Sequence, residues 1–207
     1  MLHGQESDFV LRNPEQAHGF VITIAEIRRR ARRHIQQGRN KPGDPADRDT
    51  ILRLLNEALA TELVCVHRYK RHYHMVDATV AQSIKDELLR HANDEQDHAD
   101  RLALRIVELG GTPNLSPQGL LGPSFWDDPE AETPAEMLAE DLIAERIAIE
   151  NFREIIGYVG DSDPGTRQLF EWILAVEQEQ VKDVLSLRED LLLKAASYTK
   201  AEALISA

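Results

Sequence analysis

Four glutamates interrupt apolar stripes that otherwise have the spacing of buried helix faces. They fall into two pairs of near-equal spacing, with 33 residues from Glu62 to Glu95 and 32 residues from Glu145 to Glu177. His98 follows Glu95 by three residues. A carboxylate inside a protein core is costly unless something positive compensates it. Because converging carboxylates and an imidazole suit a pair of divalent metal ions, the pattern predicts a buried dinuclear metal site.

The stripes indicate the helices that must position these residues. Apolar residues recur at steps of three and four, which keeps them on one face of a helix. The stripes cover residues 55–73, 84–109, 138–156 and 170–191. We therefore expect four long helices over residues 47–75, 77–109, 133–160 and 161–196. Each carries its ionisable residue near mid-length, so an antiparallel bundle would bring these residues to one level.

The connections between these helices favour one topology. Thr133, Pro134 and Glu136 have the spacing of a capping box at the start of the third helix. Residues 110–133 are rich in Gly and Pro and have no helical period. A connection of this length counts against a compact domain unless the topology requires it. Two helical hairpins joined along the length of a bundle do require it, so we expect an all-α antiparallel four-helix bundle with one long crossover.

The composition is that of a soluble domain in a reducing compartment. The 207 residues suffice for one well-buried domain, and hydrophobic and charged residues, at 42% and 29%, have ordinary frequencies. The one cysteine, Cys65, cannot form an internal disulfide. No apolar run approaches the ~20 residues of a membrane span, and the N-terminus lacks the order of a secretory signal. We expect a cytoplasmic protein with no membrane partner.

Residues 1–46 are predicted to be an N-terminal extension, and residues 47–207 the four-helix domain. The extension contains a predicted helix over 14–37 and a basic segment, residues 26–41, in which seven basic residues accompany only Glu26. The whole chain, in contrast, has a net charge of −12. A run of arginines can bind the phosphates of DNA whatever the base sequence. We favour packing of this segment on its own or a neighbouring subunit, because its apolar residues also need burial.

Several extended segments resemble bacterioferritins and bacterioferritin-like members of the Dps side of the ferritin superfamily. They are LLNEALATELVCVHRY, HANDEQDHADRLALRIVELGGTPNL, MLAEDLIAERIAIENFREIIGY and ILAVEQEQ, within about residues 50–190. The resemblance implies a ferritin-like bundle with one long crossover and an extra N-terminal helix. It also implies a ferroxidase that oxidises Fe(II) with O2 or peroxide at a di-iron site. The product would be stored in a homo-oligomeric shell of twelve or twenty-four subunits, of which we favour the smaller.

The resemblance also implies the roles of the site residues. The metal-binding set would be Glu62, Glu95, His98, Glu145, Glu177 and Gln180. Glu62 and His98 would hold one iron, Glu145 the other, and Glu95 and Glu177 would bridge the two. Tyr69 matches a tyrosine found beside the di-iron centre and would be catalytic, although an ordinary core aromatic residue explains it equally well.

Two positions depart from the family pattern. Gln180 stands where the family has a second histidine, and a carboxamide oxygen is a weaker donor to Fe(II) than an imidazole. We therefore expect weaker binding of the second iron and an impaired ferroxidase. Gln96 stands where haem-binding bacterioferritins carry a methionine, so we expect no haem.

Other histidines and other functions remain open at this point. We expect His91, one turn before Glu95, to be a buried, hydrogen-bonded support for the metal site, and His67, His72 and His74 to lie on the surface. The same ligand set would serve an O2-activating di-iron oxidase with an organic substrate. A Dps-like, DNA-binding protective protein is the third possibility. Assembly discriminates between storage and the oxidase, because storage needs a closed shell and an oxidase needs a substrate pocket.

Overall fold

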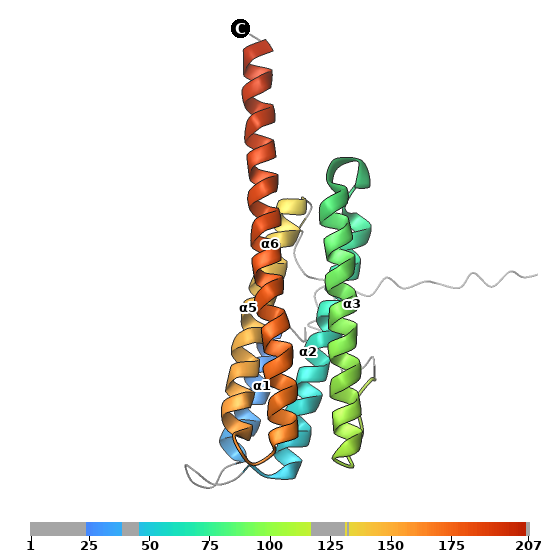
Figure 1. The fold of residues 1–207 in the computed structure, drawn as a ribbon, viewed down its shortest axis with the longest axis vertical. Coiled ribbons are helices and arrows are strands. Elements are labelled where there is room, and N and C mark those ends of the chain that lie inside the picture. Colours follow the sequence, from blue (N-terminus) through green and yellow to red (C-terminus); the bar gives the residue numbers. More distant parts are fainter. Residues whose placement is uncertain (1–23, 39–45, 117–130, 132, 206–207) are drawn as a thin grey trace, which may run out of the picture.

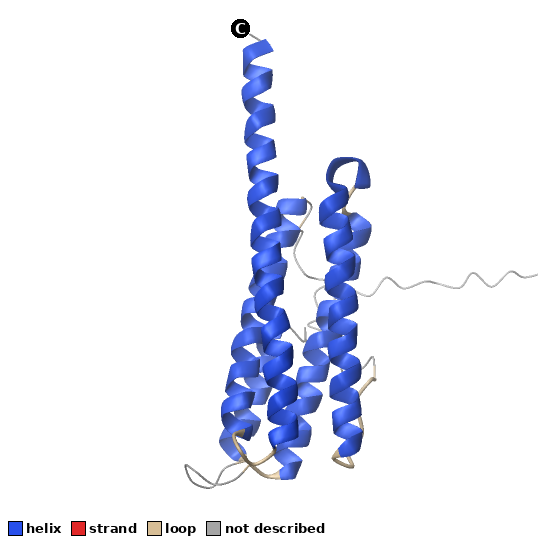
Figure 2. Ribbon diagram, in the orientation of Figure 1, coloured by secondary structure: helices blue, strands red, loops and turns tan. Residues whose placement is uncertain are grey.

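The computed structural model describes residues 24–38, 46–116, 131 and 133–205, which form five helices and, within these ranges, no strand (Figure 2). The helices are α1 (Ile24–Gln37), α2 (Arg48–Met75), α3 (Ala78–Glu108), α5 (Pro134–Val159) and α6 (Pro164–Ile205). The predicted all-α class is confirmed. No helix in the described ranges has the length and apolarity needed to cross a membrane.

Two helical hairpins make up the bundle. α2 packs mainly against α3, and α5 packs mainly against α6. α1 lies against α2 and α5, outside the four long helices (Figure 1). This arrangement agrees with the ferritin-like bundle and extra N-terminal helix expected from the sequence.

Local sequence explains where the helices begin and end. The Thr133 side chain accepts a hydrogen bond from the backbone N–H of Glu136, and the Glu136 carboxylate accepts one from the backbone N–H of Thr133. The predicted capping box is therefore present. At the end of α5, Gly160 has φ +52°, and after α3, Gly110 has φ +69°. Glycine adopts this left-handed conformation at little cost, so both helices end there.

The charged residues of the predicted stripes form a layer between two apolar clusters. On one side lie Val64, Leu88, Ala92 and Val184, and on the other lie Leu59, Ala99, Phe152 and Ile173. Each glutamate of the four stands on its helix between a member of the first cluster and a member of the second. The apolar clusters hold the helices at fixed separations on both sides of the charged layer.

Two predicted boundaries differ from the structure. α6 continues to Ile205, nine residues beyond the predicted end at residue 196. The extra residues are mainly good helix formers, with neither glycine nor proline to stop the helix. α1 is described from Ile24 onward, so the predicted start at residue 14 lies outside the described residues.

The basic segment of α1 packs on acidic groups of the same chain. Ile24, Ile27 and Ala31 are buried, and the guanidinium groups face away from them. Its ion pairs are Arg28–Glu150, Arg28–Glu154, Arg30–Glu57 and Arg32–Glu154, with Arg29 and Arg33 facing Glu26. The basic helix therefore packs on its own subunit, which is one of the two packing arrangements that we favoured.

Candidate metal centre

All six predicted ligand positions are buried, with about 1% of each side chain exposed. α2 contributes Glu62, α3 Glu95 and His98, α5 Glu145, and α6 Glu177 and Gln180. In Glu62, Glu95, His98 and Glu177, donor atoms lie within 4.8 Å of one another. Three helices thus bring a carboxylate-rich ligand set to one point, as the antiparallel arrangement of the stripes predicted.

His98 lies at the middle of this group. Its Nδ1 is 3.2 Å from Oε2 of Glu62 and 3.1 Å from Oε1 of Glu177. A third carboxylate, that of Glu95, is 3.7 Å away. The edge of the imidazole ring contacts Trp172, with ring centroids 5.3 Å apart. The imidazole is therefore held in place by one apolar neighbour and three carboxylates.

Glu145, which neighbours Glu177, has a further partner on α2. Its carboxylate accepts a hydrogen bond from the Tyr69 hydroxyl, and both side chains are buried. Burial, and then the charge of Glu145, raise the pKa of Tyr69 well above its usual range, so the hydroxyl keeps its proton. Tyr69 therefore lies directly beside a predicted ligand, which favours the role implied by the family resemblance over that of a simple core residue.

The buried carboxylates fit a site that receives positive charge. Burial raises the pKa of Glu62 and of Glu177. The rise is larger for Glu95 and for Glu145, where burial is again the largest cause and the neighbouring charges of Glu62 and Glu177 respectively come next. Without a cation, the raised pKa values therefore favour the protonated form of these carboxyl groups. A bound metal ion would replace those protons.

Oxygen and nitrogen atoms without a partner also fit bound metal ions. Buried atoms without a hydrogen bond are uncommon in proteins and call for an explanation. Around the centre they are Glu62 Oε1, Glu95 Oε1, Glu145 Oε2, both carboxylate oxygens of Glu177, His98 Nε2, and both polar atoms of the Gln180 carboxamide. Two divalent ions among these atoms would occupy most of them.

The remaining histidines are placed partly as predicted. His91 is buried, and its ring meets that of Tyr69 edge to face at 5.1 Å, so the expected burial is confirmed. His67 and His74 are exposed, as predicted. The prediction for His72 was wrong, because this residue is fully buried with Nδ1 3.0 Å from the Asp141 carboxylate.

The helical period could have revealed the buried His72–Asp141 pair. His72 follows the buried Tyr69 by three residues, and Asp141 precedes Glu145 by four. Both spacings keep a residue on the same face of a helix. Neighbouring basic residues suggested a surface position, but the face of the helix decides burial.

Residues 52–193 match the Ferritin family, described as the ferritin-like domain. The chain belongs to the ferritin-like family. It is 31% identical to a bacterioferritin of Brucella melitensis over 147 residues, which is 70% of this chain and 85% of that protein. It is 30% identical to a bacterioferritin of Mycobacterium avium over 151 residues, or 72% and 87% of the two chains. The resemblance to bacterioferritins is thus confirmed.

Two solved structures of the family superimpose on this bundle. One is a dodecameric thioferritin from Bacteroides fragilis with a TM-score of 0.62 and 24% identity, covering 84% of this chain and 98% of that one. The other is the Rhodobacter capsulatus bacterioferritin, solved with a metal-free dinuclear site and a heme iron. Its TM-score is 0.60 at 26% identity, with 70% of this chain and 87% of that one covered.

Proposed function

We propose that the protein oxidises Fe(II) at a dinuclear site in its bundle and stores the product iron. Membership of the ferritin-like family supports iron storage with ferroxidase activity. The observation that carries the proposal is the meeting of Glu62, Glu95, His98 and Glu177 in one buried layer. These donors include the oxygen and nitrogen types that bind first-row divalent ions such as Fe(II).

The residues have distinct tasks in this reaction. We assign Glu62 and His98 to one Fe(II), Glu145 to the other, and Glu95 and Glu177 to both. Two Fe(II) ions held together can pass two electrons to O2 or peroxide and leave as two Fe(III). The carboxylates offset the added positive charge, and the carboxyl protons released on Fe(II) binding can go to the reduced oxidant.

Tyr69 and Gln180 would tune the second iron position. The Tyr69 hydroxyl orients Glu145 through its hydrogen bond. Gln180 stands on α6 three residues after Glu177, with both polar atoms of its carboxamide buried and unpartnered. Its oxygen can face a metal ion, but it is a neutral donor and weaker than an imidazole. The second iron should therefore bind less tightly than the first, and iron rather than haem is the group that we expect in the protein.

Storage implies a closed homo-oligomer, and we favour twelve subunits. The Bacteroides fragilis relative is described as dodecameric. On the outside of this subunit, Leu104, Val107 and Ile143 are 60%, 56% and 60% exposed. Exposed apolar side chains are common singly, but three of this size on α3 and α5 are consistent with contacts between subunits. We place the shell in the cytoplasm, with residues 1–46 as an extension on a ferritin-like domain.

Two other functions have less support. Binding of DNA through the basic segment would require its guanidinium groups to leave Glu57, Glu150 and Glu154, which they contact within the subunit. An oxidase of an organic substrate would use the same ligands without a shell. Assembly and iron content distinguish both from storage.

To test the proposal, Fe(II) and then O2 are added to anaerobic protein. The absorbance of Fe(III), the native mass of the particle and the iron that it retains are measured. We expect oxidation within a multi-subunit particle that keeps its iron. Glu177→Gln should abolish rapid oxidation. The matched control is Glu179→Gln, two residues on in α6, where the carboxylate is 68% exposed and paired with Lys182. A one- or two-chain particle, or a Glu177→Gln variant as fast as the unmodified protein, would contradict the proposal.

A further inference from the structure

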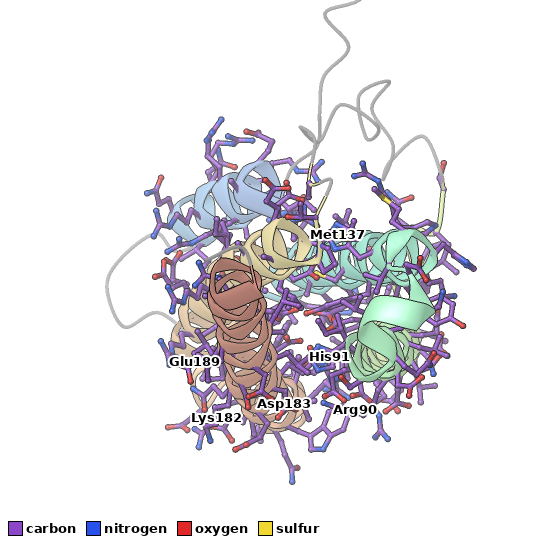
Figure 3. The ribbon with its side chains drawn as sticks, turned by 90° about the horizontal axis from the view of Figure 1, so that it is seen from above. Arg90, His91, Met137, Lys182, Asp183 and Glu189 are labelled. Carbon is purple, nitrogen blue, oxygen red and sulfur yellow. The ribbon has the colours of Figure 1, made fainter. Side chains whose placement is uncertain are left out.

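A second group of ligand-type residues lies beside the dinuclear centre, nearer to solvent. Donor atoms of Glu87 and His91 on α3 and of Asp183 on α6 all lie within 4.8 Å of one another. His91 Nε2 is 3.2 Å from a Glu87 oxygen and 4.0 Å from an Asp183 oxygen. Figure 3 shows His91, Arg90 and Asp183 together in the space between α3 and α6. We call Glu87, His91 and Asp183 the outer cluster.

His91 makes this group more than a set of surface acids. Its side chain is 1% exposed, whereas those of Glu87 and Asp183 are 26% and 43% exposed. The cluster is therefore open to solvent on its acidic side and ends inside the bundle at an imidazole. Burial, and then the charge of Arg90, lower the pKa of His91 to about 4, so the imidazole is neutral at neutral pH. A neutral imidazole has the electron pair that metal binding requires, and here Nε2 lies 2.9 Å from Nη2 of Arg90, the group that an incoming ion would displace.

Arg90 already places a cation in the outer cluster. Its Nη2 is 2.5 Å from Asp183 Oδ2, its Nε is 3.0 Å from Glu87 Oε1, and its Nη1 is 2.9 Å from Asp94 Oδ2. Three carboxylates thus surround one guanidinium, which leaves an excess of two negative charges. A divalent ion would neutralise that excess, whereas the single charge of Arg90 does not.

The contacts of Arg90 also show how an ion could displace it from the outer cluster. The guanidinium meets the outer cluster through Nη2 and Nε, but meets Asp94 through Nη1. It can therefore release Glu87 and Asp183 and remain paired with Asp94. Arg90 and Asp94 are both partly exposed, at 45% and 34%, so no buried charge would be stranded by the change.

The outer cluster lies one to two helical turns from the dinuclear centre along both helices. On α3, His91 precedes Glu95 by four residues, and on α6, Asp183 follows Glu177 by six. These separations correspond to about 6 Å and about 9 Å along the helix axes. Gln180 stands between Glu177 and Asp183 on α6, and its buried carboxamide has no partner. An unpaired buried donor and acceptor are what we expect of a polar residue that a metal ion passes between two sites.

We infer that Glu87, His91 and Asp183 form a second divalent-cation site, from which the incoming ion displaces the Arg90 guanidinium. Two carboxylates and an imidazole suit Fe(II), Mn(II), Co(II) or Zn(II) rather than Ca(II). With Fe(II), this site would be a station from which ions pass Gln180 to reach the dinuclear centre. That role in iron transfer rests on the proposed function, whereas the cation site itself does not.

Cobalt binding tests the site in isolation. Full-length protein carrying Glu95→Gln and Glu177→Gln, which disable the dinuclear centre, is titrated with Co(II) by calorimetry and visible absorption. We expect one Co(II) per chain in this background. Adding Asp183→Asn should weaken it by ~10–100-fold, the range for loss of groups that support metal sites. Asp86→Asn is the control, because Asp86 is exposed on the same turn of α3 and contacts Gln82.

Arg90→Gln provides a test with the opposite sign. Because it removes the competing guanidinium, it should tighten Co(II) binding by about tenfold, whereas loss of a merely structural arginine would leave the affinity unchanged or weaken it. The inference is overturned if the disabled background binds no Co(II), if Asp183→Asn has no effect, or if Arg90→Gln weakens binding. If the protein with both glutamine substitutions fails to fold, Asp183→Asn is introduced alone and titrated with Co(II), which answers the same question.

Iron oxidation then separates the two proposals. Introduced alone, with the dinuclear centre intact, Asp183→Asn should slow Fe(II) oxidation at low iron but leave the rate at saturating iron unchanged. Cobalt binding at the outer cluster with no such slowing would overturn the transfer role alone. A protein that binds Co(II) at the outer cluster but never oxidises Fe(II) would overturn the proposed function and leave the cation site in place.

Discussion

The Tyr69 hydroxyl on α2 donates a hydrogen bond to the Glu145 carboxylate on α5, and neither side chain is accessible to solvent. The other three glutamates surround His98, and Glu177 among them also neighbours Glu145. Glu145 therefore takes its orientation from a neighbouring helix rather than from the imidazole. The two proposed iron positions are thus supported differently, with Glu145 held by Tyr69 and the other glutamates gathered around His98.

Removal of the Tyr69 hydroxyl should affect both stability and activity. Tyr69→Phe leaves a buried Glu145 oxygen without its donor, which costs about 1–3 kcal/mol of unfolding free energy. Fe(II) oxidation should slow, because Glu145 is no longer oriented. Calorimetry and stopped-flow absorbance measure the two effects. Tyr158→Phe is the control, because it removes a hydroxyl that contacts Asp47 at 3.2 Å, remote from the centre, and should leave the oxidation rate unchanged.

Replacement of Gln180 should strengthen the second iron position. Gln180→His supplies the imidazole of the family pattern, so the two positions should fill more equally in an Fe(II) titration. Affinity at that position should rise by ~10–100-fold, and oxidation should become faster. Gln96→His, which adds an imidazole where the Gln96 amide contacts Asp100, should change neither quantity. Equal, tight binding of two irons without the substitution would show that Gln180 is already an adequate ligand.

The pH dependence of metal binding follows from the raised carboxyl pKa values. Burial and neighbouring charge raise the pKa of Glu95 and of Glu145, which favours the carboxyl forms that carry protons in the metal-free protein. Divalent ions must displace those protons, so binding should release protons and tighten as pH rises. These groups also bind more protons folded than unfolded, so the metal-free protein should lose their contribution to stability as pH rises above the ordinary carboxyl value.

Thermal unfolding with and without Zn(II) checks this sign. The difference in Tm between the metal-loaded and metal-free protein should widen between about pH 5 and about pH 8. Glu95→Gln should reduce the widening, because the amide has no proton to lose whereas Glu145 still has one. A difference in Tm that shrinks over this range would contradict the assignment of raised pKa values to the site.

The contacts between α1 and α5 should stabilise the subunit to a small degree. Arg32, followed by Arg28, holds the pKa of Glu154 down to about 2 despite its partial burial. Its contribution to stability is therefore present above the ordinary carboxyl value and is lost as pH falls towards 2. Glu154→Gln should cost about 1 kcal/mol or less in urea unfolding at neutral pH, because partly exposed ion pairs contribute little. Glu150→Gln, which removes a more exposed partner of Arg28, should cost less.

The helices and the level of the site could be read from the sequence because both depend on local periodicity. A step of three or four residues places Glu62, Glu95, Glu145 and Glu177 on the same faces as their apolar neighbours, whatever the rest of the fold does. Thr133 and Glu136 set the start of α5 by hydrogen bonds within one turn. Burial of these residues could therefore be predicted without knowledge of the packing.

Tertiary structure alone decided which side chains meet across helices. Tyr69 contacts Glu145, His72 contacts Asp141, and Arg90 contacts Asp183 because of the rotation and depth at which each helix packs. Those quantities come from the fit of two apolar clusters contributed by all the helices, and no segment contains them by itself. Periodicity tells which face of a helix is buried, but the distance between side chains on different helices is a property of the whole bundle.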